Sequence, residues 1–152
     1  MALRWLSGLA FPILLLTLSC SEKPTTMATF NTRLVTLPDG SEIRAEVMAH
    51  PEDMMRGMMF RDSLAADRGM LFIHGEPGRF KYFMFQVRIP LDIIWMDRNR
   101  RIVELSPNTP PCKTRASDCP TYGGNENALY VLELQAGSIE KHRLKAGHQL
   151  SF

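Results

Sequence analysis

Asp92 has the setting that most strongly suggests a chemical role, because it interrupts the apolar run Leu91-Asp-Ile-Ile94. A carboxylate buried without a partner is costly, and Arg61 or Arg56 could supply a charge-assisted, bidentate contact. One interpretation is structural, with Asp92 in an ion pair or anchoring a loop. The other is functional, with Asp92 orienting a ligand or acting as an acid or base in a pocket. The structural interpretation is favoured.

Glu133, in Val131-Leu-Glu-Leu134, raises the same question. On an alternating strand its side chain faces away from Leu132 and Leu134, so we expect it to be exposed to solvent. A carboxylate pair would form only if Glu133 and Asp92 converged on one cleft, and the sequence does not place them together. No catalytic residue is assigned. The candidate ligand-binding residues are Asp92, Arg61, Arg56, Glu133 and Met84.

The ten methionines offer thioethers, which are soft ligands for Cu(I). Met54, Met55, Met58 and Met59 are close in sequence. A second group, Met58, Met70, Met84 and Met96, could be neighbours in the core. Methionine is also ordinary core filler, and core packing is the favoured interpretation. The four histidines lack ligand spacing, and no nucleophile elbow, phosphate loop or Cys–His pair stands out. We therefore expect no metal and no cofactor.

Residues 1–19 have the order of a secretory signal peptide, with Arg4 ahead of an uncharged apolar stretch. As a helix this stretch would span roughly 21 Å, short of the ~30 Å hydrocarbon core of a bilayer. Leu16-Thr-Leu-Ser-Cys20 resembles a bacterial lipobox, although Thr17 stands where Leu is usual. An ordinary cleavable signal with an incidental cysteine is the alternative. We expect lipid on Cys20.

Lipidation would make the membrane the chain's first partner, through several acyl chains on Cys20. Residues 20–32 would form a polar tether. Ser21 rather than Asp follows the cysteine, which resembles outer-membrane sorting in a diderm. The expected location is therefore the cell envelope, at the outer membrane facing the periplasm if the organism is diderm.

Assigning Cys20 to lipid leaves Cys112 and Cys119, and an even remainder in an exported protein implies a disulfide. The intervening residues are rich in turn formers, which predicts a loop. A redox centre typically has Cys-x-x-Cys spacing, and a metal site would need further Cys or His nearby. A structural disulfide is favoured over both.

The rest of the chain, residues 33–152, has the length of one domain and the patterns of a β protein. Pro38-Asp-Gly40 predicts the turn of a hairpin over Arg33–Ala49, and Pro51 and Gly57 bound a short helix. Further strands are expected at Met70–Ile73, Phe80–Val87, Leu91–Met96, Arg101–Leu105, Ala128–Leu134 and Gln149–Phe152, with turns at Gly75–Gly78 and Asp97–Arg100 and a helix over Ser138–Leu144. We predict a mainly β fold, a single compact antiparallel β-sandwich or jelly-roll-like domain with one or two short helices.

Four ordered motifs carry a family resemblance: Arg56-Gly-Met-Met-Phe-Arg61, Arg68-Gly-Met-Leu-Phe72, Ile89-Pro-Leu-Asp-Ile-Ile-Trp-Met-Asp97 and Tyr130-Val-Leu-Glu-Leu-Gln-Ala-Gly137. Over residues 33–152 the chain resembles the bacterial and archaeal family of domains of unknown function designated DUF192. The resemblance implies a compact, mainly β domain, often exported, without an established activity. The family commonly reads Phe-Trp-Met-Lys-Asn-Thr where this chain reads Tyr82-Phe-Met-Phe-Gln-Val87, so only Met84 is retained and polar chemistry on this strand is less expected.

Two functional hypotheses follow. The preferred one is a non-catalytic binding or accessory module at the envelope, which contacts a small ligand or another envelope protein. The alternative is an enzyme that acts on an envelope substrate through Asp92 and Arg61. Nucleic acid is not an expected partner, because the net charge is only +2 and no basic stripe is present.

Overall fold

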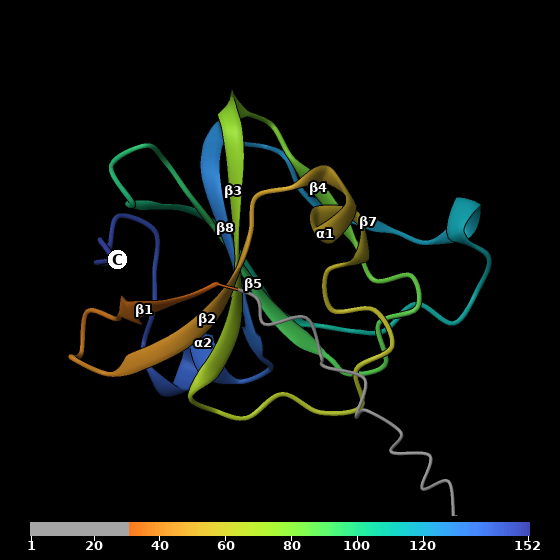
Figure 1. The fold of residues 1–152 in the computed structure, drawn as a ribbon, viewed down its shortest axis with the longest axis horizontal. Helices are drawn as coiled ribbons and strands as arrows, with labels where there is room; N and C mark the ends of the chain where they lie inside the picture. Colours follow the sequence, from red (N-terminus) through yellow and green to blue (C-terminus); the bar gives the residue numbers. More distant parts are fainter. Residues whose placement is uncertain (1–30) are drawn as a thin grey trace, which may run out of the picture.

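The computed structural model describes residues 31–152 (Figure 1). The predicted signal peptide, Cys20 and the tether up to residue 30 lie outside the described residues. The elements are β1 (Thr32–Thr36), β2 (Glu42–Met48), α1 (Pro51–Arg56), β3 (Arg68–Gly78), β4 (Lys81–Phe83), β5 (Leu91–Met96), β6 (Ile102–Thr109), the 3₁₀ turn η1 (Ala116–Asp118), β7 (Thr121–Gly123), β8 (Ala128–Gln135) and α2 (Ser138–Lys141). Within residues 31–152, neither helix has the length and apolar character needed to cross a bilayer.

Six strands form one sheet in the order β1-β2-β3-β8-β5-β6, and β4 pairs with β7 in a second, two-stranded sheet. The prediction of a mainly β domain with short helices is confirmed. The large sheet is mixed rather than wholly antiparallel, because β2 and β3 pair in parallel. Between Met48 and Arg68 the chain passes through α1 and returns to the end where β2 began, which a parallel pair requires.

The two faces of the large sheet carry separate hydrophobic clusters. On one face Leu132 and Leu134 of β8 pack with residues of β1, β2 and the C-terminal segment. On the other face Val131 packs with Trp95, and β4, β7 and α1 lie over this side of the sheet (Figure 1). Strand β8 lies between β3 and β5 in the sheet, and because a hydrophobic cluster lies on each face, its side chains are covered on both sides.

The C-terminal segment Gln149–Phe152 does not form the predicted strand. Instead, Ser151 makes an isolated bridge with Thr36 of β1, and Gln149 makes one with Arg101, which precedes β6. These two bridges join the opposite edges of the large sheet. They therefore close one side of the domain in the manner of a barrel.

The predicted hairpin over Arg33–Ala49 is confirmed by the antiparallel pairing of β1 and β2. Helix α1 begins at the predicted Pro51 and is followed by Gly57 at φ 43°. The helix predicted over Ser138–Leu144 is shorter and ends at Lys141. Its N-terminus is not capped by a side chain, because the Ser138 hydroxyl donates to the Gln135 carbonyl instead.

Two other local predictions are wrong. The strand predicted over Phe80–Val87 is reduced to β4, because the chain turns at Gln86, which has φ 58°. The turn predicted at Gly75–Gly78 lies inside β3, where these residues form an irregularity in the pairing with β8 rather than reversing the chain.

Cys112 and Cys119 are bonded as predicted, with their sulfurs 2.02 Å apart. The bond closes a small loop that contains η1. This loop lies beside the segment that follows β4, because Phe85 forms a bridge with Cys112. Closing a ring of this size contributes about 2.5 kcal/mol in the chain-entropy description.

Candidate functional site

Glu133 lies in the middle of β8, directly opposite Met70 of β3 and Ile93 of β5. The prediction that it is exposed is wrong, because its residue surface is only 6% exposed. Its side chain lies on the face of the sheet that α1 and β4 cover. Both of these segments are distant from Glu133 in the sequence. Burial of this carboxyl is the central feature of the site.

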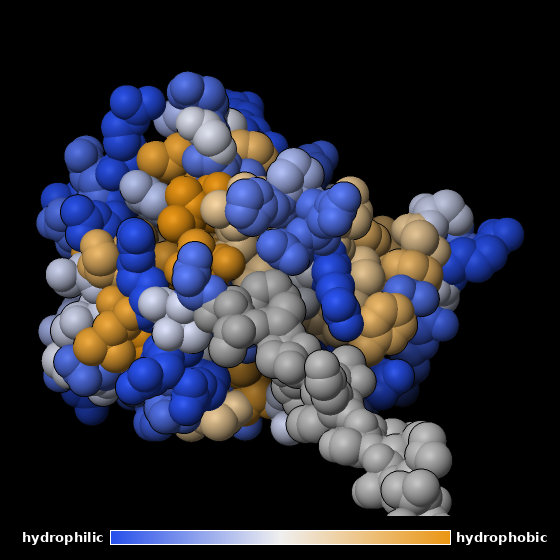
Figure 2. Space-filling view, in the orientation of Figure 1, coloured by the Kyte–Doolittle hydropathy of each residue, from blue (hydrophilic) through white to orange (hydrophobic). Residues whose placement is uncertain are grey.

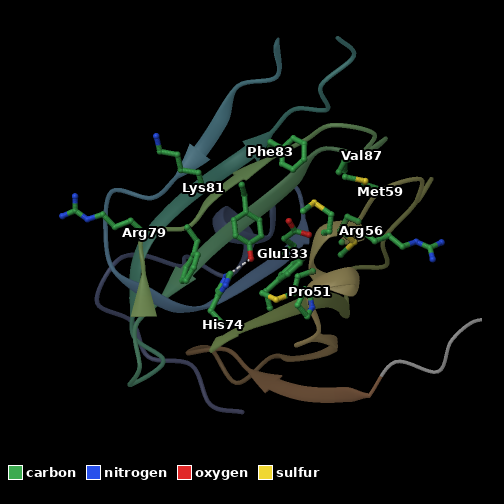
Figure 3. Close-up of a pocket in the computed structure, with 16 residues that line it drawn as sticks. Pro51, Arg56, Met59, His74, Arg79, Lys81, Phe83, Val87 and Glu133 are labelled. Atoms are coloured by element: carbon green, nitrogen blue, oxygen red, sulfur yellow. Dashed lines mark hydrogen bonds between the residues drawn. The ribbon is translucent and has the colours of Figure 1, made fainter. Parts of the chain in front are cut away.

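A pocket of about 430 Å³ opens above Glu133 (Figure 3). The residues lining it come from α1 and the following turn, from β3, from the segment around β4, and from β8: Pro51, residues 54–59, Phe72, His74, residues 79–83, Val87 and Glu133. Most of these side chains are aromatic rings, thioethers or aliphatic groups. Pockets of this volume and character are typical of sites for small organic ligands.

The Glu133 carboxyl forms no hydrogen bond within residues 31–152, and its Oε2 atom is fully buried. Burial raises the pKa of this carboxyl to about 8, and the nearby Arg61 guanidinium lowers it by a smaller amount. Glu133 is therefore mainly protonated at neutral pH. A buried carboxyl without a partner is destabilising, and such groups occur chiefly where a ligand or a reaction needs them.

Arg61 does not neutralise Glu133, because its guanidinium is bound to Glu46. Two N–H groups of Arg61 donate to the two carboxylate oxygens of Glu46, each at 2.6 Å. This bidentate pair raises the pKa of Arg61 further and fixes the guanidinium. Arg61 therefore acts on the pocket only through its charge.

His74 and Tyr82 supply two further polar groups of the pocket. The His74 ring stacks on Phe80 with centroids 3.4 Å apart, and its Nε2 lies 3.2 Å from the Tyr82 hydroxyl. Burial lowers the pKa of His74 to about 4. Burial, and secondly the charge of Glu133, raise the pKa of Tyr82. At neutral pH Glu133, His74 and Tyr82 are therefore mainly uncharged.

Asp92 lies outside the pocket, on the opposite face of the sheet from Glu133. Its register partner is Leu134, whereas Glu133 pairs with Ile93. The carboxylate is fully buried and accepts the backbone N–H of Asn108 at 2.7 Å and that of Ile139 at 2.6 Å. Asp92 thus anchors two loops, and it pairs with neither of the arginines considered for it.

The methionines of residues 31–152 divide between the pocket and the two cores. Met84 is 1% exposed in the same hydrophobic cluster as Met58 and Met70, and it does not line the pocket, whereas Met96 belongs to the other cluster. The lining thioethers are Met54, Met55, Met58 and Met59. Within residues 31–152, no three His, Cys, Asp or Glu side chains gather as a metal site would require.

Of the five candidate ligand-binding residues, the structure places Glu133 and Arg56 at the pocket, and Arg61 near enough to Glu133 to act on it through its charge but not among the lining residues. Asp92 and Met84 lie elsewhere. His74, Phe80 and Tyr82 were not candidates from the sequence. The local signal for Glu133 was the apolar character of positions 129 and 131, which share its side of the strand.

Large apolar side chains are sparse on the surface of residues 31–152. Leu34, Met55 and Phe60 are the exposed ones, and the face in Figure 2 shows orange areas interrupted by blue polar side chains. Met55 is 69% exposed and also lines the pocket. The pocket mouth therefore presents apolar surface to solvent.

Comparisons with known proteins give a family and similar solved structures, including the following two. The model of DUF192, described as an uncharacterized ACR, matches residues 34–152. A crystal structure of a protein of unknown function from Novosphingobium aromaticivorans is 25% identical with a TM-score of 0.75, over 84% of this chain and 89% of that chain. A second, described as a putative transcription regulator from Sinorhizobium meliloti, is 26% identical with a TM-score of 0.72, over 80% and 94%. No curated protein matches the chain.

Proposed function

The chain belongs to the DUF192 family, and from its pocket we propose that the domain is a non-catalytic, small-ligand-binding module anchored at the cell envelope. The observation that carries the binding role is the buried Glu133 carboxyl, which faces a pocket of about 430 Å³ and forms no hydrogen bond with any side chain or backbone group of residues 31–152. A ligand that supplies this hydrogen bond removes the cost of leaving the group unpaired.

Binding fits the described residues better than catalysis through Asp92 and Arg61. Asp92 accepts two backbone N–H groups on the far face of the sheet, and Arg61 is paired with Glu46. The carboxylate pair considered from the sequence would need both carboxylates to reach one substrate. Glu133 and Asp92 lie on opposite faces, so they do not form such a pair.

Saturable binding of a neutral apolar dye, N-phenyl-1-naphthylamine, tests the pocket without assuming a ligand class. We expect one dye per chain in the full-length protein, detected by a rise in fluorescence. Met54→Trp should block the pocket and abolish binding, whereas Leu34→Trp, outside the pocket, should leave it unchanged. A folded protein without saturable binding, or equal binding by both variants, would contradict the proposal.

The envelope anchor is supported by the signal-like residues 1–19 and the lipobox-like sequence at Cys20. A disulfide between Cys112 and Cys119 also suits an exported protein, since such bonds persist in oxidising compartments. We expect labelled palmitate to be incorporated into the full chain, and the chain to fractionate with the outer membrane of a diderm host.

Cys20→Ser should lose the label and the membrane association, while Cys112→Ser should retain both. A wild-type chain that stays unlabelled in the soluble fraction would show that the anchor is absent. This result would leave the binding role of the pocket unaffected.

A further inference from the structure

Charge is distributed in a definite order along the Glu133 pocket. Glu133 is the single acidic side chain among the sixteen residues that line it, and it lies at the inner end. Arg56, Arg79 and Lys81 border the pocket, and Figure 3 shows their side chains directed away from Glu133. An acidic group therefore lies inside and basic groups lie at the rim.

The three basic side chains of the rim have no ion-pair partner within the described part of the chain. The salt bridges of residues 31–152 involve other basic side chains, such as Arg61 with Glu46 and Arg88 with Asp62. Flexible, unpaired Lys and Arg side chains at a pocket mouth can turn toward an anionic group. The rim thus favours a ligand with a negative charge at its outer end.

The inner end favours the opposite charge. The described part of the chain offers no hydrogen-bond donor to the buried oxygen of Glu133, and an ammonium group can supply both the donors and the countercharge. Phe72, Phe80 and Tyr82 line the same space, and aromatic faces attract organic cations. The volume of about 430 Å³ also has room for an organic body behind the charged group.

We propose that the ligand is a small zwitterion of the ω-amino acid type, with its ammonium at Glu133, an apolar chain against the thioethers and rings, and its anionic group at Arg79 and Lys81, which Figure 3 shows on the same side of the pocket. This inference rests on the proposed binding function. On binding, the ammonium keeps its protons and the Glu133 carboxyl gives its proton to solvent. A buried ion pair then replaces an unpaired acid.

Four six-carbon probes separate the contributions of the two charges: 6-aminohexanoate, hexylamine, hexanoate and hexan-1-ol. Each is tested for displacement of N-phenyl-1-naphthylamine from the full-length protein at pH 7. We expect 6-aminohexanoate to bind most tightly and hexylamine next, with hexanoate and hexan-1-ol at least about tenfold weaker than hexylamine. Calorimetry in buffers of different ionisation enthalpy should show release of about one proton per amine below pH 8.

Substitutions assign each charge to its residue. Glu133→Gln should weaken both amines at least about tenfold and leave the dye and hexan-1-ol unchanged. The double variant Arg79→Gln with Lys81→Gln should weaken 6-aminohexanoate to the level of hexylamine. The matched control Lys145→Gln, exposed and away from the pocket, should change neither.

Several results would overturn the proposed ligand class while leaving a binding pocket in place. They are tighter binding of hexan-1-ol or hexanoate than of hexylamine, an equal effect of Glu133→Gln on all four probes, no proton release, and no displacement of bound dye by any probe. Failure of the dye itself to bind would remove the proposed function, and this inference with it.

Discussion

The guanidinium of Arg61 lowers the pKa of Glu133 through its charge but gives its hydrogen bonds to Glu46, at 2.6 Å each. The pocket therefore keeps an acid that is buried, mainly protonated at neutral pH and without a hydrogen-bond partner among residues 31–152. A fold that retains such a group gives up stability at this position. The resulting pH dependence can be measured without knowing the ligand.

Glu133→Gln should make the protein less sensitive to pH. Because the pKa of Glu133 is about 8 in the folded state and 4.5 in its usual environment, the folded state binds more protons between these values. Wild-type stability should then fall with rising pH across this window, by up to about 1.4 kcal/mol per pH unit, and the glutamine variant should lack this loss.

Urea unfolding at pH 5, 6.5, 8 and 9 measures the difference. The stability gain of Glu133→Gln over wild type should grow from pH 5 to 8 and level off above. Glu140→Gln, at an exposed glutamate, is the control, and its unfolding free energy should change with pH as that of wild type does. If the unfolding free energy of Glu133→Gln changed with pH in the same way as that of wild type, the Glu133 carboxyl would not be held protonated in the folded state.

His74→Phe should improve stability in acid. The pKa of His74 is lowered to about 4 from 6.5, so the unfolded state binds more protons between these values. Wild-type stability contributed by neutral His74 is therefore lost as the pH falls through this window. Phenylalanine keeps the ring stacked on Phe80 but loses the contact with the Tyr82 hydroxyl.

His74→Phe should thus change the unfolding free energy in two opposite ways, since it removes a histidine that destabilises the fold in acid and also removes the contact with the Tyr82 hydroxyl. The lost hydrogen bond should cost about 1 kcal/mol at pH 7, and this deficit should shrink steadily toward pH 4. Thermal melts from pH 4 to 7.5 test the trend. His50→Phe, at an exposed histidine, serves as the control, and a deficit independent of pH would show that His74 does not titrate as described.

The sequence predicted β5 and β8 well because each is a run of apolar residues bounded by turns. It failed for Glu133, since the alternation of Leu132 and Leu134 was taken to define one buried face only. Val131, on the side of Glu133, is also fully buried. The cover on that side comes from α1 and β4, and local periodicity does not report distant segments.

Asp92 shows a different limit. That a carboxylate in an apolar run needs a partner was apparent from the sequence, and the loop-anchoring role was among the interpretations considered. The partners themselves are the backbone amides of Asn108 and Ile139, which lie 16 and 47 residues away. Backbone amides carry no sequence signal, so only the fold could identify them.

Asp92→Asn should destabilise the domain by about 2–4 kcal/mol without affecting the pocket. An asparagine side chain offers one carbonyl acceptor, and its NH₂ group would face one of the two N–H donors. Urea unfolding measures the loss, and dye binding below the transition should equal that of wild type. Asp67→Asn, whose side chain is 71% exposed, is the control, and a loss of dye binding by folded Asp92→Asn would link Asp92 to the site.

Gly123→Ala should be among the most damaging single-methyl additions to this fold. Gly123 ends β7 at φ +72°, and an added Cβ would lie 2.2 Å from Cζ2 of the buried Trp95 ring, which packs against Tyr82. Gly40, at φ +85°, has nothing within 4 Å of the same position. Gly40→Ala should therefore lower the unfolding free energy by about 1–2 kcal/mol, the cost of a residue with a Cβ at positive φ. Gly123→Ala should lower it by that amount and by about 1–3 kcal/mol more, because the added methyl group overpacks the core. Unfolding free energies of the two variants measure the difference, and equal losses would show that β7 moves freely off Trp95.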